Sequence, residues 1–136
     1  MMSANSGKPV FYPSQMAREA LATRFGLPFH YSMQDWEWEV ADVKRFDEFF
    51  EAYRAEGVTD AERYSLMEIM IQCVEEMPLS LFDSAWQRIK LSLLARPEIH
   101  ASTISYWACL EDIGPEAEFE VSRNMRRIWR MISDQM

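Results

Sequence analysis

Glycine and histidine are scarce in this chain of 136 residues, and each shortage argues against a class of function. The four glycines form no Gly-x-Gly-x-x-Gly, Gly-x-x-x-x-Gly-Lys or Gly-x-Ser-x-Gly motif, so the sequence predicts neither a phosphate-binding loop nor a nucleophile elbow. The two histidines, His30 and His100, stand outside any zinc or di-iron spacing. We therefore expect no metal, no other cofactor and no enzymatic activity. An enzyme would need a deep pocket that holds carboxylates with shifted pKa values.

Cysteines and long apolar runs are also rare. Cys73 and Cys109 are the only cysteines, and each falls in an apolar helical pattern without Cys-x-x-Cys spacing, so we expect two reduced core residues. No apolar run precedes Pro9, and the sequence predicts neither a signal peptide nor a membrane span. We expect a cytoplasmic protein with a flexible N-terminal segment, 1–12, followed by a single domain over 13–136.

Few turn residues and ten methionines favour helices over strands. Apolar residues recur with helical spacing in six segments, which begin near residues 14, 43, 60, 82, 97 and 122. The first five of these segments end near residues 25, 56, 77, 95 and 111. The sequence therefore predicts an all-α, single-domain antiparallel bundle of about six helices with short loops.

Two helix starts have clear signals. Thr59 and Glu62 have the spacing of a capping box, and Ser122 is placed to cap the last helix. The helix from residue 60 to 77 is apolar around most of its circumference, which predicts a central position covered by its neighbours. Trp86, Trp107 and Trp129 have helical spacing among apolar residues, and we expect them mainly in the core.

The segment Asp35–Asp42 is the strongest candidate for a functional surface, because it interleaves four carboxylates with two tryptophans and contains no basic residue. Trp36 and Trp38 alternate as in a strand, but no partner strand is apparent, and we favour a short helical or irregular entry with Asp42 as the next N-cap. Positions i and i+2 of a helix face opposite sides, so one tryptophan is expected outside the core. An exposed tryptophan with an acidic rim is typical of a protein interface. The candidate partner-binding residues here are Asp35, Trp36, Glu37, Trp38, Glu39 and Asp42.

A second acid run supplies four more candidates, Glu111, Asp112, Glu116 and Glu118, and continues to Glu120. The pair Glu75-Glu76 is interpreted as ordinary surface charge. Four arginines near the C-terminus either pair with one of the acid runs or stabilise the last helix through its dipole: Arg123, Arg126, Arg127 and Arg130. The net charge of −8 disfavours nucleic acid and anionic membranes as partners, whereas a basic protein would be attracted.

Three stretches of the sequence resemble small bacterial immunity proteins associated with polymorphic toxins of the Rhs, type VI or contact-dependent kinds. These stretches are Met33–Asp42, Arg45–Phe49 and Leu66–Gln72. A looser likeness extends to Ile104–Asp112 and Met125–Trp129. The resemblance implies a protein that binds and neutralises a cognate secreted toxin domain. An acidic surface suits the occlusion of a basic toxin's active site, because complementary charge speeds encounter.

A second interpretation belongs to a different class. A helical scaffold or regulatory adaptor would use the aromatic segment for self-association or for another protein partner. The sequence is compatible with a monomer or a homodimer. A tight dimer that buries Trp36 and Trp38 in the absence of a toxin would favour this second interpretation.

Overall fold

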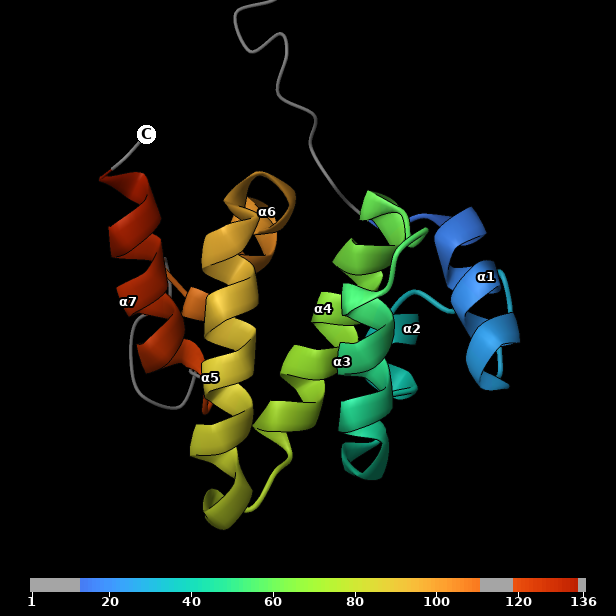
Figure 1. Cartoon of the computed structure of the whole chain (residues 1–136), viewed down its shortest axis with the longest axis horizontal. Helices are drawn as coiled ribbons and strands as arrows, with labels where there is room; N and C mark the ends of the chain where they lie inside the picture. Colours follow the sequence, from blue (N-terminus) through green and yellow to red (C-terminus); the bar gives the residue numbers. More distant parts are fainter. Residues whose placement is uncertain (1–12, 111–118, 135–136) are drawn as a thin grey trace, which may run out of the picture.

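The computed structural model describes residues 13–110 and 119–134, and every regular element in these ranges is a helix (Figure 1). The predicted all-α fold is therefore confirmed. The predicted N-terminal segment, 1–12, lies outside the described residues. Within these two ranges, seven α-helices and one 3-10 turn follow in chain order: α1 (Gln15–Phe25), α2 (Trp36–Glu39), η1 (Val43–Arg45), α3 (Phe46–Arg54), α4 (Asp60–Glu75), α5 (Leu79–Ala95), α6 (Pro97–Ala108) and α7 (Ser122–Ser133).

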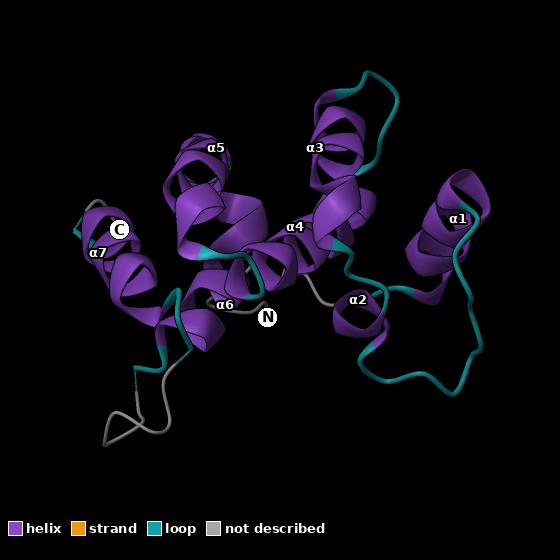
Figure 2. Cartoon of the chain, turned by 90° about the horizontal axis from the view of Figure 1, so that it is seen from below, coloured by secondary structure: helices purple, strands orange, loops and turns teal. Residues whose placement is uncertain are grey.

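Helix α4 lies at the centre of the bundle, as its apolar circumference predicts. It contacts the preceding helices α1, α2 and α3 and the following helices α5 and α6, while α7 packs on α6 and α5. Figure 2 shows that α2 and α6 lie on the same side of α4, opposite α3 and α5. Most residues of α4 are buried, including every residue from Tyr64 to Ile71. This central helix is the wall against which the candidate site is built.

One continuous apolar core joins the helices. It contains Leu21, Phe49, Trp86 and Trp107 from four different helices, and Trp129 packs partly buried against it. The tryptophans expected in the core are therefore placed as predicted. Cys73 and Cys109 are both buried free thiols, also as expected. Burial raises the pKa of the Cys73 thiol to about 12, so this residue behaves as a small apolar side chain.

Several helix ends follow directly from the sequence. The Thr59 hydroxyl accepts a hydrogen bond from the Glu62 N–H at 3.1 Å, and the Glu62 carboxylate accepts one from the Thr59 N–H at 2.7 Å, so the predicted capping box is confirmed. Ser14 caps α1 through a hydrogen bond from the Ala17 N–H. Gly26 ends α1 in the left-handed conformation, with φ of 68°, which glycine adopts at little cost.

Other boundaries differ from the prediction. Helix α5 begins at Leu79 instead of residue 82, because the carbonyl of Pro78 already accepts the first helical hydrogen bonds. Helix α4 ends at Glu75, two residues before the predicted end. Helix α6 ends at Ala108 instead of residue 111, because Cys109 takes the left-handed conformation with φ of 53°. Proline and glycine residues show roughly where a helix must end, but they do not determine which residue is the last one in the helix.

Ser122 does not cap α7 in the predicted way. It is the first residue of the helix, and its hydroxyl accepts a hydrogen bond from the Phe119 N–H at 3.0 Å and donates one to the Trp107 carbonyl at 2.7 Å. The side chain thus joins the start of α7 to the end of α6. Within residues 13–110 and 119–134, no helix has the length and apolarity needed to cross a membrane.

Candidate functional site

The segment from Asp35 to Asp42 forms the single turn of α2 and its flanks. Of its six candidate residues, only Asp35, Glu39 and Asp42 are exposed. The Asp42 carboxylate accepts a hydrogen bond from the Lys44 N–H at 3.0 Å and caps η1, so the predicted N-cap is confirmed. These three carboxylates are the part of the predicted acidic rim that a partner can reach.

Trp36 faces the core. It is fully buried, its indole N–H donates to the Pro28 carbonyl at 2.7 Å, and its ring meets Phe29 edge to face. Trp38 packs partly buried against the same core, so neither tryptophan lies outside it, contrary to expectation. Trp36 cannot serve as an exposed anchor, and that part of the prediction is also wrong, because the loop that contains Pro28 and Phe29 covers it.

Glu37 is also buried and does not belong to an acidic rim. Its two carboxylate oxygens accept from Arg18, at 2.9 Å from Nε and 2.6 Å from a terminal guanidinium nitrogen, and Oε2 also accepts from the Ser65 hydroxyl at 2.7 Å. The remaining guanidinium donors bind the carbonyls of Met33 and Gln34. This buried charge is tolerated because it is paired with a guanidinium and accepts three hydrogen bonds.

Arg18 is a functional residue that the sequence interpretation missed. It lies on α1 and is buried there with Ala17, Leu21 and Ala22. The positions i, i+3 and i+4 of this set define the inward stripe of α1. An arginine on an otherwise apolar stripe was the available signal, because such a residue must find a buried acceptor.

Trp38 is half-buried and is the remaining candidate anchor. Its ring stacks on Tyr106 with centroids 5.4 Å apart and an interplanar angle of 21°, and it meets Trp107 edge to face at 5.9 Å. Its indole N–H donates to Glu68 on α4 at 3.0 Å. Tyr106 is 48% exposed, so this aromatic stack reaches the surface beside α2.

Glu68 joins three helices at the base of this stack. Its Oε1 accepts from the indole N–H groups of Trp38 and Trp107, each at 3.0 Å, and its Oε2 accepts from the Thr103 hydroxyl at 2.8 Å. Burial raises the pKa of this carboxyl, and the three hydrogen bonds partly oppose that effect. The sequence signal for Glu68 was a single acid inside the wholly apolar stretch of α4.

A cavity of about 240 Å³ opens where α2, α4 and α6 meet. Its surface opening is formed by exposed residues that include Asp35 and Tyr106, and its interior reaches the buried carboxylates of Glu37 and Glu68. The lining residues are Pro13, Arg18, Gln34, Asp35, Glu37, Trp38, Tyr64, Glu68, Ser102 and Tyr106. The first half of the acidic segment thus lines part of a pocket, which could not be predicted from the sequence.

The second acid run cannot be placed in the same way. Glu111, Asp112, Glu116 and Glu118 lie outside the described residues. The neighbouring pair Glu75-Glu76 is not simple surface charge, because the Glu75 carboxylate accepts from the backbone N–H groups of Glu120 and Val121 at 2.7 and 3.1 Å. The Glu75 carboxylate therefore holds the start of α7, because it accepts from N–H groups there that have no carbonyl partner within the helix.

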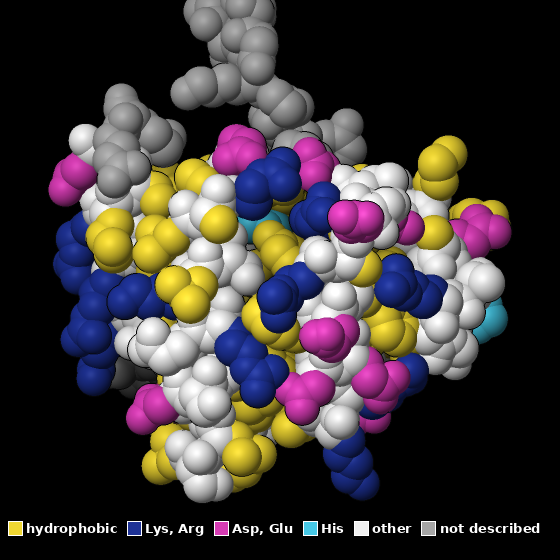
Figure 3. All heavy atoms as spheres, in the orientation of Figure 1, with side chains coloured by type: hydrophobic (Ala, Val, Ile, Leu, Met, Phe, Trp, Pro, Cys, Tyr) yellow, Lys and Arg dark blue, Asp and Glu magenta, His cyan; other side chains and the backbone are white. Residues whose placement is uncertain are grey.

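The C-terminal arginines form a basic edge. Arg126 donates to the Ala108 carbonyl at 2.8 Å, whereas Arg123, Arg127 and Arg130 are exposed. Figure 3 shows the resulting band of basic side chains along the edge that α7 forms. None of the described ion pairs joins these arginines to the acids of the Asp35–Asp42 segment.

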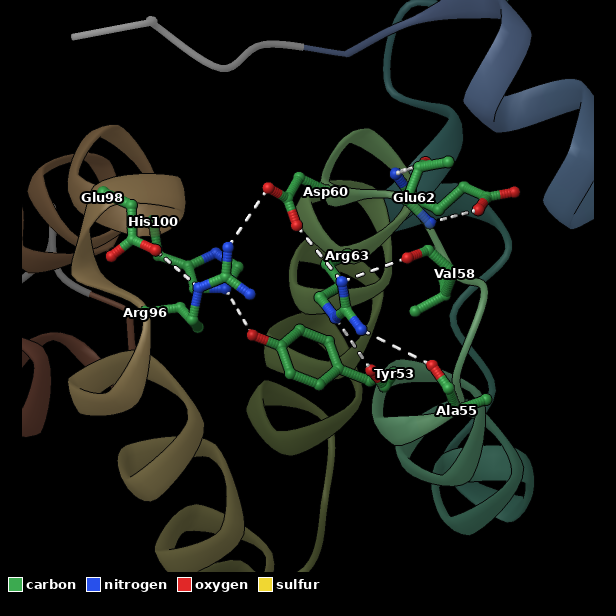
Figure 4. A network of polar contacts seen from close by, with 10 residues as sticks. Tyr53, Ala55, Val58, Asp60, Glu62, Arg63, Arg96, Glu98 and His100 are labelled. Atoms are coloured by element: carbon green, nitrogen blue, oxygen red, sulfur yellow. Dashed lines mark hydrogen bonds and ion pairs between the residues drawn. The ribbon is translucent and has the colours of Figure 1, made fainter.

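A separate polar network joins α3, α4 and α6 (Figure 4). Tyr53 and His100 share a hydrogen bond of 2.7 Å between the phenol oxygen and Nε2. Arg63 donates to the carbonyls of Tyr53, Val58 and Ala55, and Asp60 pairs with both Arg63 and Arg96. Burial lowers the pKa of His100 to about 4, so its imidazole is neutral at physiological pH. This network ties α3 and the start of α4 to the start of α6.

Within the described ranges, no three side chains of His, Cys, Asp or Glu are grouped in a way that could hold a metal ion. Comparison of the chain with protein-family models, with curated proteins and with solved structures gives no significant match. The geometry of the Trp38 cavity and the distribution of charge are therefore the observations on which function must be argued.

Proposed function

We propose that this chain is an immunity protein that binds and neutralises a cognate bacterial toxin domain by covering the toxin's active site. The observation that carries the proposal is the cavity beside Trp38, which is lined by this half-buried tryptophan, the exposed Tyr106 and the exposed carboxylate of Asp35. The resemblance of Met33–Asp42 to immunity proteins points to the same surface.

The physical features of this surface suit a basic protein partner. The chain has a net charge of −8, and long-range attraction would speed its encounter with a basic toxin in the cytoplasm. After encounter, a partly buried aromatic side chain with an acidic rim provides the anchor-and-rim arrangement on which tight interfaces depend. Asp35, Glu39 and Asp42 would supply the rim, with Trp38 in place of Trp36 as the anchor.

An acid–base enzyme is the competing use of the same cavity, because Glu68 is a carboxyl with a raised pKa inside a pocket. Its oxygens, however, already accept three hydrogen bonds from protein donors, and Glu37 is held by Arg18 and Ser65. A general acid or base must be able to reach the proton of its substrate, whereas the oxygens of these two carboxyl groups are occupied by donors of the protein itself. This arrangement favours a binding site over a catalytic one. We therefore favour binding.

Co-expression tests the proposal directly. The toxin domain encoded beside this chain should stop growth of a bacterial host when expressed alone, and the intact chain should restore colony counts. The variant Asp35→Asn/Glu39→Gln/Asp42→Asn should protect less well at equal protein level. If the neighbouring domain is harmless, or if the chain gives no protection, the proposal is wrong.

A helical scaffold that acts through self-association is the second candidate, and one observation favours it. Leu79 and Leu81, at the start of α5, are 86% and 50% exposed, and Figure 3 shows hydrophobic side chains gathered at this end of the bundle. Contiguous exposed apolar side chains often mark protein interfaces. Light scattering decides between a monomer and a dimer, and Leu79→Ser/Leu81→Ser should dissociate a dimer formed through this patch.

A further inference from the structure

Glu68 is a buried carboxylate without a cationic partner in the part of the chain that the structure describes. It is only 6% exposed, and none of the described ion pairs includes it. A carboxylate offers about four lone-pair positions, and three are used by Trp38, Trp107 and Thr103. One acceptor position therefore remains on a buried carboxyl group that lines a cavity.

The charged residues that line this cavity do not balance. Asp35, Glu37 and Glu68 contribute three carboxylates, and Arg18 contributes one guanidinium. The Arg18 guanidinium is already engaged by Glu37, so it does not neutralise Glu68. Buried charges are normally paired, so an organic cation from outside would stabilise the ionised form of Glu68, which burial alone disfavours.

The size and walls of the cavity restrict which cation fits. At about 240 Å³ the cavity is smaller than the roughly 300–1,000 Å³ pockets that take drug-sized ligands, so it suits the end of one side chain. Trp38, Tyr64 and Tyr106 supply aromatic walls. A guanidinium is planar, weakly hydrated and stacks on aromatic rings, whereas an ammonium is compact and strongly hydrated. These walls therefore favour arginine over lysine.

We propose that the cavity beside Trp38 binds the guanidinium group of an arginine side chain, with Glu68 as its carboxylate acceptor and the aromatic residues as its walls. The identification of the arginine as part of a toxin rests on the proposed function, whereas the binding of the guanidinium does not. The fold already contains one guanidinium–carboxylate pair at the same cavity, that of Arg18 and Glu37.

The indole N–H groups give a direct readout. Trp38 and Trp107 donate to Glu68, whereas Trp36 donates to Pro28 and lies outside the cavity lining. In a titration of the nitrogen-15-labelled chain with Nα-acetyl-arginine amide, the indole signals of Trp38 and Trp107 should shift together and saturate, with Kd on the order of millimolar for so small a ligand. The indole signals of Trp36, Trp86 and Trp129 should stay in place.

Matched ligands and variants make the test specific. Nα-acetyl-citrulline amide has the same shape without the charge, and it should leave the Trp38 and Trp107 signals unshifted. Glu68→Gln should weaken binding of the arginine amide at least tenfold, whereas Glu98→Gln, outside the cavity, should leave it unchanged. If Glu68→Gln fails to fold, Tyr106→Leu removes one wall and should weaken binding at least threefold.

Three results would overturn the inference: an equal response to the citrulline amide, unchanged binding by Glu68→Gln, or no indole shift up to the solubility limit of the arginine amide. Tighter binding of Nα-acetyl-lysine amide would overturn the choice of guanidinium. The titration contains no toxin, so its failure leaves the growth-protection result untouched. Conversely, absence of protection does not affect a measured titration.

Discussion

Arg18 and Glu37 form a two-point ion pair that ties α1 to α2, with side chains that are only 5% and 4% exposed. The same guanidinium holds the carbonyls of Met33 and Gln34, so one side chain fixes the chain segment that leads into α2. The position of Trp38 in the candidate site depends on this arrangement, because Trp38 belongs to the short helix that Arg18 holds.

Replacement of Arg18 by methionine should therefore be costly. Arg18→Met leaves the Glu37 carboxylate buried without its cation, and we expect a loss of about 3–5 kcal/mol in the free energy of unfolding, measured with urea. The double variant Arg18→Met/Glu37→Leu removes both charges and should be clearly more stable than the single variant. A double variant as unstable as Arg18→Met would contradict a cost that arises from the unpaired charge.

Neutralisation of the exposed acids should change the association rate more than stability. Asp35→Asn/Glu39→Gln/Asp42→Asn should slow association with the partner roughly tenfold at low salt and flatten the salt dependence of the rate, because steering depends on local charge. Stopped-flow fluorescence measures both quantities.

The control variant removes the same number of charges elsewhere. Glu51→Gln/Glu56→Gln/Asp83→Asn has the same net charge, and its three positions are exposed. It should keep a faster rate than the first variant. Equal rates for the two variants would mean that total charge steers association and that the Asp35–Asp42 surface has no special role.

His100 should make the folded state sensitive to acid. Above pH 6.5 both the folded and the unfolded chain hold a neutral imidazole, and between 6.5 and about 4 only the unfolded chain binds the proton. Stability therefore falls as pH falls through this window, by up to about 1.4 kcal/mol per pH unit from this residue. His100→Gln should have a shallower acid limb in unfolding experiments than the parent chain. Parallel curves for the two proteins would refute the prediction. The raised pKa values of Glu68 and Glu75 change the stability in the opposite direction as pH falls, but both proteins contain these residues, so their effect cancels in the comparison.

The capping box at the start of α4 should contribute measurably to stability. Thr59→Ala removes the acceptor for the Glu62 N–H and should cost about 0.5–2 kcal/mol of unfolding free energy. Glu62→Ala removes the reciprocal acceptor for the Thr59 N–H. In a double-mutant cycle the two losses should be less than additive, because each side chain positions the other. Full additivity would show that the two hydrogen bonds act independently.

The helices with strong local signals were predictable from the sequence. Thr59, Gly26 and Pro97 act within a few residues of their own position, so the capping box, the end of α1 and the start of α6 follow from local chemistry. The central place of α4 followed from its apolar circumference. The start of α5 was less accurate, because its first turn uses the Pro78 carbonyl. Helix α7 starts at Ser122 as predicted, but the Ser122 hydroxyl bonds to the Trp107 carbonyl and does not act as the N-cap.

The candidate site was only half predictable. The spacing of Trp36 and Trp38 led to the expectation that one of them lies outside the core, but Trp36 is fully buried and Trp38 packs partly buried against the same core. The indole of Trp36 is held by the Pro28 carbonyl and that of Trp38 by Glu68, and neither contact could be predicted from the local pattern. Glu68 stood out only as a single acid in an apolar stretch, and its hydrogen-bond donors lie 30 to 39 residues away in the sequence.

The central position of α4 also determines whether the chain can be cut into two fragments that fold independently. The helices before α4 and the helices after it all pack against α4, and most of its residues are buried between them. A fragment that ends after α4 would expose the side that faces α5 and α6, and a fragment that begins at α4 would expose the side that faces α1, α2 and α3. Each fragment would therefore expose apolar side chains that the other half covers in the intact chain, so truncation at the middle of the chain should yield two aggregating pieces instead of two folded units.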